Sequence, residues 1–198
     1  MRFKDLYEFA LDGKAKSDQS LVSVTKLAHQ VKARHEEIGD INFWPASIDE
    51  NVILGYMTFD YDRASSREEE YKIIDIKYSR TLNFCWRRFV CCKELMHAFD
   101  NQKERTNSKV KLQRLLSELE TTPMSDDFSA MLSSEFRAEW MALICLCPKP
   151  VRDQITAQLQ SKDITPLQAA EKIKVPEMVI NAVTKPYYDQ ALDEFLSM

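Results

Sequence analysis

The chain has 198 residues, and a hydrophobic fraction of 44% beside a charged fraction of 29% excludes a wholly disordered or fibrous protein. With only 3 glycines, the composition favours long helices over a many-turned β-sandwich. The formal net charge of −4 argues against a general nucleic-acid-binding protein.

No segment approaches the roughly 20 consecutive apolar residues that cross a bilayer, so we expect a cytoplasmic protein without a membrane partner. The five cysteines are an odd number and lie in apolar, helix-like segments, unlike a secreted disulfide framework. Their spacing also differs from the CxxC pairs of a zinc ribbon. We therefore predict reduced cysteines that pack as small hydrophobic residues. They are Cys85, Cys91, Cys92, Cys145 and Cys147.

The N-terminal part of the chain predicts one helix followed by two strands. Apolar residues recur at helical spacing over 21–38, and Gly39 is suited to end that helix. A turn is expected around residues 44–45. The segments 52–61 and 71–79 are rich in β-branched and aromatic residues, which predicts two antiparallel strands joined by a charged hairpin loop.

The rest of the chain predicts helices separated by short breaks. Pro148 and Pro150 mark a sharp helix end, because proline cannot continue the helical hydrogen-bond ladder. After Thr165, two short helices around a Lys-Val-Pro turn suggest a helix-turn-helix shape, followed by a closing helix. The longer predicted helices are 81–100, 110–120, 128–147 and 151–159, with a polar break at 101–108.

One helical segment carries a pattern close to a metallopeptidase motif. Lys93, Glu94 and His97 occupy the first, second and fifth positions of a sequence that reads KELMH. In HExxH, two histidines on one helix face bind zinc, and the intervening glutamate activates the metal-bound water. Here lysine stands in the place of the first histidine. Taken alone, this fragment is more typical of an ordinary solvated helix face than of a metal site.

The wider context resembles the ImmA/IrrE family of zinc-dependent endopeptidases, which have a zincin fold. In that family an Arg-Phe-bearing helix leads into HExxH, and a later helix supplies a glutamate from an ExxA segment. The stretch 87–97 reads RRFVCCKELMH, and 135–148 begins EFRAEWMAL and ends in Leu-Cys-Pro. The resemblance implies that His97 and Glu135 are zinc ligands and that Glu94 is the general base if the protein is active. Glu139 stands where Asn or Asp is usual.

Lys93 is the main departure from the family pattern. Lysine is a poor zinc ligand, because deprotonating an ammonium of pKa near 10.4 at pH 7 costs about 4–5 kcal/mol. Asp100 is a possible oxygen ligand or a solvent-facing residue, and His29 and His35 are alternative ligands from a distant helix. We hypothesise instead that the Lys93 ammonium occupies the metal position and pairs with Glu135, so that no cofactor is expected.

These observations predict an α+β fold: a small antiparallel sheet packed on an active-site-type helix, a degenerate metallopeptidase domain over 1–150, and a helical, helix-turn-helix-like extension over 151–198.

Because active members of the family cut helix-turn-helix repressors, often those of mobile elements or stress responses, the resemblance implies a role in transcription regulation. The main hypothesis is a pseudoenzyme that binds a protein partner such as a helix-turn-helix repressor. The alternative is an active zinc-dependent endopeptidase that cleaves such a repressor. Direct DNA binding is disfavoured, because 163–198 holds three lysines against six acidic residues.

Overall fold

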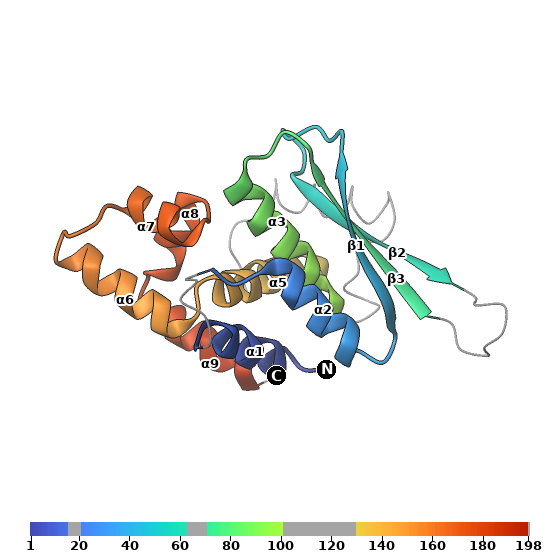
Figure 1. Cartoon of the computed structure of the whole chain (residues 1–198), viewed down its shortest axis with the longest axis horizontal. Helices are drawn as coiled ribbons and strands as arrows, with labels where there is room; N and C mark the ends of the chain where they lie inside the picture. Colours follow the sequence, from blue (N-terminus) through green and yellow to red (C-terminus); the bar gives the residue numbers. More distant parts are fainter. Residues whose placement is uncertain (16–20, 63–70, 101–129, 198) are drawn as a thin grey trace.

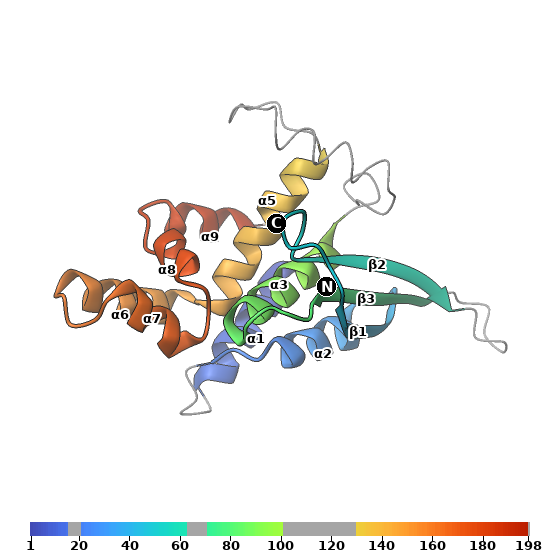
Figure 2. The ribbon, with the colours of Figure 1, turned by 90° about the horizontal axis from the view of Figure 1, so that it is seen from above.

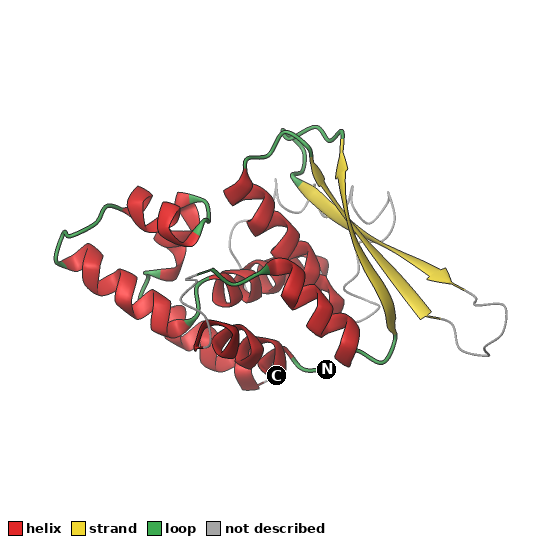
Figure 3. Ribbon diagram, in the orientation of Figure 1, coloured by secondary structure: helices red, strands yellow, loops and turns green. Residues whose placement is uncertain are grey.

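The computed structural model describes residues 1–15, 21–62, 71–100 and 130–197. These residues form an α+β structure with a three-stranded sheet near the N-terminus and a mainly helical C-terminal half (Figure 1, Figure 3). The predicted helix at 110–120, the break at 101–108 and most of the predicted hairpin loop lie outside the described residues. The strands are β1 (Ile38–Ala46), β2 (Gly55–Asp62) and β3 (Tyr71–Ser79). The helices are α1 (Phe3–Ala15), α2 (Val24–Arg34), α3 (Phe84–Met96), the 3₁₀ turn η1 (His97–Phe99), α5 (Ala130–Leu146), α6 (Lys149–Gln160), α7 (Pro166–Ile173), α8 (Glu177–Val183) and α9 (Tyr188–Ser197).

The sheet is mixed, with the strand order β1-β3-β2. β2 and β3 are antiparallel, as predicted, whereas β1 runs parallel to β3. The prediction of an antiparallel sheet is therefore wrong for β1. The expected turn at 44–45 is also wrong, because Trp44 and Pro45 lie within β1. Pro45 is tolerated there because β1 is an edge strand, where one missing backbone N–H need not interrupt a ladder.

Gly39 has a different role from the predicted one. α2 ends at Arg34, with His35 as its C-cap, and Gly39 already belongs to β1. A Cβ atom at position 39 would lie 2.8 Å from the Cβ of Tyr71. Glycine is therefore required by the close approach of Tyr71 and not by a helix end.

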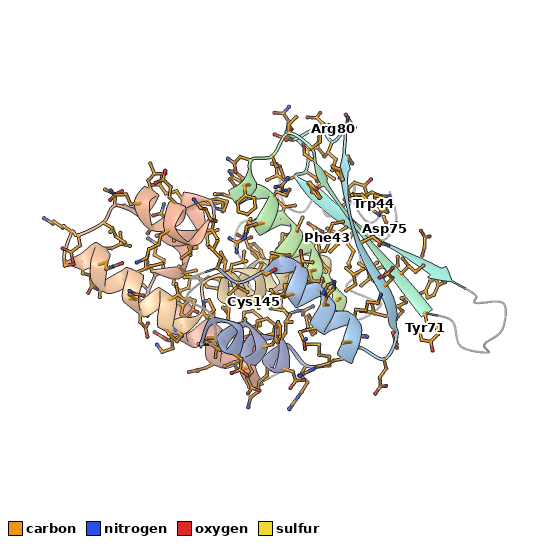
Figure 4. All side chains as sticks on the ribbon, viewed as in Figure 1. Phe43, Trp44, Tyr71, Asp75, Arg80 and Cys145 are labelled. Carbon is orange, nitrogen blue, oxygen red and sulfur yellow. The ribbon has the colours of Figure 1, made fainter. Side chains whose placement is uncertain are left out.

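Helices α2 and α3 contact the sheet, and α3 contacts β2 as well as β3. Ile74 and Ile76 of β3 are completely buried beneath these helices. Figure 4 shows Phe43 on the helix side of the sheet, whereas Trp44 and Asp75 lie on its other side. There the Trp44 indole N–H donates to Oδ1 of Asp75 at 3.0 Å. Successive side chains of a strand thus point to opposite faces of the sheet, and the apolar face packs against α3.

Helix α3 packs against α5, and α1 contacts both α5 and α9. Figure 2 shows α3 and α5 between the sheet at one end of the molecule and α6 and α7 at the other. The start of the chain was not predicted to be helical, but α1 buries Phe3, Leu6 and Tyr7 in this core. Four of the five free cysteines are buried, and the thiol of Cys145 lies completely inside. None of the described helices is both long and apolar enough to cross a membrane.

The C-terminal segment forms the two short helices and the turn that the sequence predicts. Thr165 and Gln168 make a capping box at the start of α7. Lys174 ends this helix in the left-handed conformation, with φ 53°, and Pro176 precedes α8. The division of the chain at residue 150 stays a prediction. It falls within the first turn of α6, two residues after Pro148.

Candidate functional site

Helix α3 holds the KELMH segment at its C-terminal end. Asn83 caps the helix, and its side chain accepts a hydrogen bond from the backbone N–H of Trp86 at 3.0 Å. The helix ends at Met96, so that Lys93 and Glu94 lie in its last turn and His97 begins the following 3₁₀ turn. The segment is therefore anchored on a helix whose apolar residues are buried against the sheet and α5.

The side chain of Lys93 lies between two carboxylates. Its Nζ is 2.6 Å from Oε2 of Glu135 on α5 and 3.0 Å from Oε1 of Glu94 on its own helix. Glu94 is only 6% exposed, whereas the side chains of Lys93 and Glu135 are about one-quarter exposed, at 22% and 24%. The structure thus contains the ion pair that we hypothesised between Lys93 and Glu135. This pair is the part of the network that lies nearest the protein surface.

The charge of Lys93 is stabilised by its surroundings. Burial by itself lowers the pKa of the ammonium, but the charges of Glu94 and Glu135, together with hydrogen bonds to both, raise it above its ordinary value. Reciprocally, burial favours the neutral form of Glu135, but hydrogen bonding to His97 and the charge of Lys93 lower its pKa to about 2. Lys93 is therefore an ammonium at neutral pH, and it carries no lone pair for a metal.

His97 bridges this pair to a second, more deeply buried cluster. Its Nε2 is 3.5 Å from Oε1 of Glu135, and its Nδ1 is 2.7 Å from Oδ2 of Asp100. Oδ2 of Asp100 also accepts a hydrogen bond from the hydroxyl of Ser134 at 2.6 Å, and Oδ1 accepts one from Arg137 at 3.1 Å. Asp100 is thus buried rather than solvent-facing, and it contacts the ring nitrogen that points away from Glu135.

The imidazole of His97 is held in its charged form. Burial by itself lowers its pKa, but hydrogen bonds to Asp100 and Glu135 and the charge of Glu94 raise it to about 9. At pH 7 both ring nitrogens then carry protons and donate, one toward each carboxylate. A histidine in this state has no free lone pair to offer a metal ion.

Positive and negative groups balance in this cluster. Among the residues that the structure describes, three cations face three carboxylates. The cations are Lys93, His97 and Arg137, and the carboxylates are Glu94, Glu135 and Asp100. One further acid lies close by: burial and the charge of Glu135 raise the pKa of Glu139, against the opposing charge of Lys93.

Sequence reasoning named Lys93, Glu94, His97, Glu135 and Asp100, and the structure brings all five together. It missed Ser134 and Arg137, which hold the Asp100 carboxylate. Their signal in the sequence was their spacing: Ser134 and Arg137 are three residues apart, which places both on one side of the helix. His29 is exposed on α2, and His35 caps the end of that helix.

The donor set does not fit zinc at neutral pH. Zinc binds neutral imidazole and carboxylate, whereas here the position beside Glu135 is taken by an ammonium, and the nearest imidazole is protonated. Within the part of the chain that the structure describes, no three His, Cys, Asp or Glu side chains are placed to hold a metal ion.

We compared the chain with known protein families, curated proteins and solved structures. None of the family models, curated proteins or solved structures compared with the chain matches it.

Proposed function

We propose that this chain is a non-catalytic regulatory protein similar to the ImmA/IrrE endopeptidases, and that it acts by binding a protein partner such as a helix-turn-helix repressor. The observation that carries the proposal is the 2.6 Å ion pair between Lys93 and Glu135, at the position where the family resemblance places two zinc ligands. The order of the two helices, one carrying KELMH and the next carrying Glu135, supports the zincin-like assignment.

The ion pair explains how such a scaffold remains stable without zinc. Two carboxylates that converge in a partly buried place repel each other and are costly when no cation lies between them. Lys93 contacts both Glu94 and Glu135 and so supplies that cation from within the chain. A resident ammonium makes the charge balance independent of metal supply.

The same contacts argue against hydrolysis at this site. A general base must reach the proton of a bound water through a free lone pair. Glu94 is 6% exposed, and its Oε1 already accepts a hydrogen bond from Lys93. Without a metal to polarise water, the carboxylate of Glu94 serves to hold Lys93 rather than to activate a nucleophile.

A protein partner fits the chain better than DNA does. The C-terminal segment that contains α7 and α8 carries three lysines against six acidic residues over 163–198. Binding to duplex DNA depends on neutralising phosphates with cations, so this segment is poorly suited to it. Recognition of another protein, including a repressor, does not require that charge.

Metal content and partner binding test the proposal together. Protein purified without chelators should contain no stoichiometric zinc, whereas Lys93→His should acquire zinc affinity, as measured by metal analysis and calorimetric titration. The wild-type chain should form a complex with a helix-turn-helix repressor encoded beside its gene and leave that repressor intact on a gel. Cleavage that a chelator or Glu94→Gln abolishes would establish the endopeptidase alternative instead.

A further inference from the structure

Arg88 is a buried arginine whose described hydrogen bonds all go to backbone carbonyls. It lies on α3, five residues before Lys93, and is 8% exposed. Its Nη1 donates to the carbonyl oxygen of Ile173 at 2.8 Å and to that of Lys174, and its Nη2 donates to that of Val22 at 2.7 Å. Burial lowers its pKa, but a guanidinium remains protonated at neutral pH.

The carbonyls of Ile173 and Lys174 are those at the end of α7. The last carbonyls of a helix have no partner within the helix and carry the negative end of its dipole. Lys174 takes the left-handed conformation there, which turns the chain toward α8 through Val175, itself 2% exposed. Arg88 thus satisfies both the charge and the hydrogen bonds of this helix end.

We infer that Arg88 docks the C-terminal helix pair, α7 with α8, onto the site helix α3, and that the local stability of this pair depends on Arg88 more than the stability of the sheet does. α7 and α8 contact each other and are joined by only three residues, and α8 also contacts α5. The sheet contacts α2 and α3, and no ladder of it involves the pair. Arg88 is therefore a positioning residue for the pair.

A guanidinium suits this role, because its planar array of donors reaches three carbonyls at once. Lysine keeps the charge but presents it as a point on a flexible stem, and methionine keeps only the length of the stem. Arg87, the preceding residue, is exposed, and its Cζ lies 5.6 Å from the centre of the Phe84 ring. Arg88 stacks on the same ring at 5.9 Å. Arg87→Met is thus a control that removes a neighbouring arginine with a similar ring contact.

Hydrogen exchange of the full-length protein, followed amide by amide, tests the inference. Arg88→Met should speed exchange at least tenfold at amides of the pair such as Ala169, Val179 and Thr184, and leave the β1–β3 ladder unchanged. Arg88→Lys should give a smaller increase at the same amides, and Arg87→Met none. If Arg88→Met does not fold, the Arg88→Lys comparison decides the question. Equal acceleration in the sheet, or unchanged exchange in the pair, would overturn the inference.

Discussion

Lys93 and Glu135 join the two central helices of the molecule: Nζ on α3 lies 2.6 Å from Oε2 on α5. The two residues are far apart in the sequence, and the apolar packing of α3 on α5 brings them together. Because Lys93 also pairs with Glu94, its ammonium contacts two carboxylates at once.

Lys93→Ala should destabilise the fold by about 2–4 kcal/mol. Removing one partner of a buried ion pair costs about 3–5 kcal/mol. The partial exposure of Lys93 and Glu135 moves our expectation toward the lower end. Urea unfolding measures the change, and Lys26→Ala, an exposed lysine on α2, should stay within about 0.5 kcal/mol of wild type. No loss of stability in Lys93→Ala would contradict the internal-cation proposal.

A double-mutant cycle separates the pair from general packing effects. Lys93→Met with Glu135→Gln should cost less than the sum of the two single changes, because the double variant leaves neither charge stranded. We expect a coupling energy of about 1–3 kcal/mol from urea unfolding of the four proteins. Additive costs would mean that the two side chains do not interact in solution.

The stability of the protein should fall as pH rises from about 6.5 to 9. His97 has a pKa of about 9 in the folded state, above its ordinary value of 6.5. Its contribution is therefore complete below pH 6.5 and is lost as the pH rises through 9, and it amounts to at most about 3 kcal/mol. NMR titration of the His97 ring protons measures the pKa directly. Asp100→Asn should lower the pKa, because it removes the carboxylate beside Nδ1. A wild-type midpoint near 6.5 would contradict this prediction.

Gly55→Ala should destabilise the protein by about 1–3 kcal/mol, because the added methyl group would crowd the contact between β2 and α3. A Cβ atom there would lie 2.5 Å from Cγ1 of Val90 and 2.9 Å from the carbonyl oxygen of Lys77. Adding Val90→Ala should recover only part of the loss, since the backbone contact remains. Thermal unfolding of the two variants and of Val90→Ala alone measures the recovery. If Gly55→Ala is as stable as wild type, β2 and α3 are not as close as described.

Lys174→Gly should stabilise the protein by about 1 kcal/mol. The left-handed conformation costs a residue with a Cβ roughly 1–2 kcal/mol, and glycine adopts it freely, at some cost in unfolded-chain entropy. Lys174 has φ 53° and ψ 54°. Glu171→Gly, inside α7, is the matched control and should destabilise by about 1 kcal/mol. Destabilisation by both changes would show that position 174 is not left-handed in solution.

The sequence predicted most helices and two strands because their apolar periodicity is a local property. It missed β1, because Gly39 and Pro45 resemble breakers until their neighbours are known. Gly39 fits a strand on account of Tyr71, and Pro45 fits because β1 lies at the edge. Parallel pairing between β1 and β3 joins residues more than 30 positions apart, as in Ile41 with Ile74, and leaves no short-range signal.

The residues of the candidate site also divide into those that a local pattern predicted and those that depend on tertiary neighbours. A motif on one helix pointed to Lys93, Glu94 and His97, and the family resemblance added Glu135. The burial of Asp100 was not predictable, because it follows from Ser134 and Arg137 on another helix. The charged state of His97 likewise depends on tertiary neighbours rather than on local spacing.

The central position of β3 determines when the sheet can assemble during synthesis of the chain. Of the three strands in the described part of the chain, β3 is the last to leave the ribosome, yet it lies in the centre, and β1 and β2 do not pair with each other. A nascent chain that stops short of β3 therefore carries two strands with no partner in the sheet. Both edges assemble on one template strand, so the sheet forms only when β3 becomes available, and the site helix α3 follows it directly in the chain.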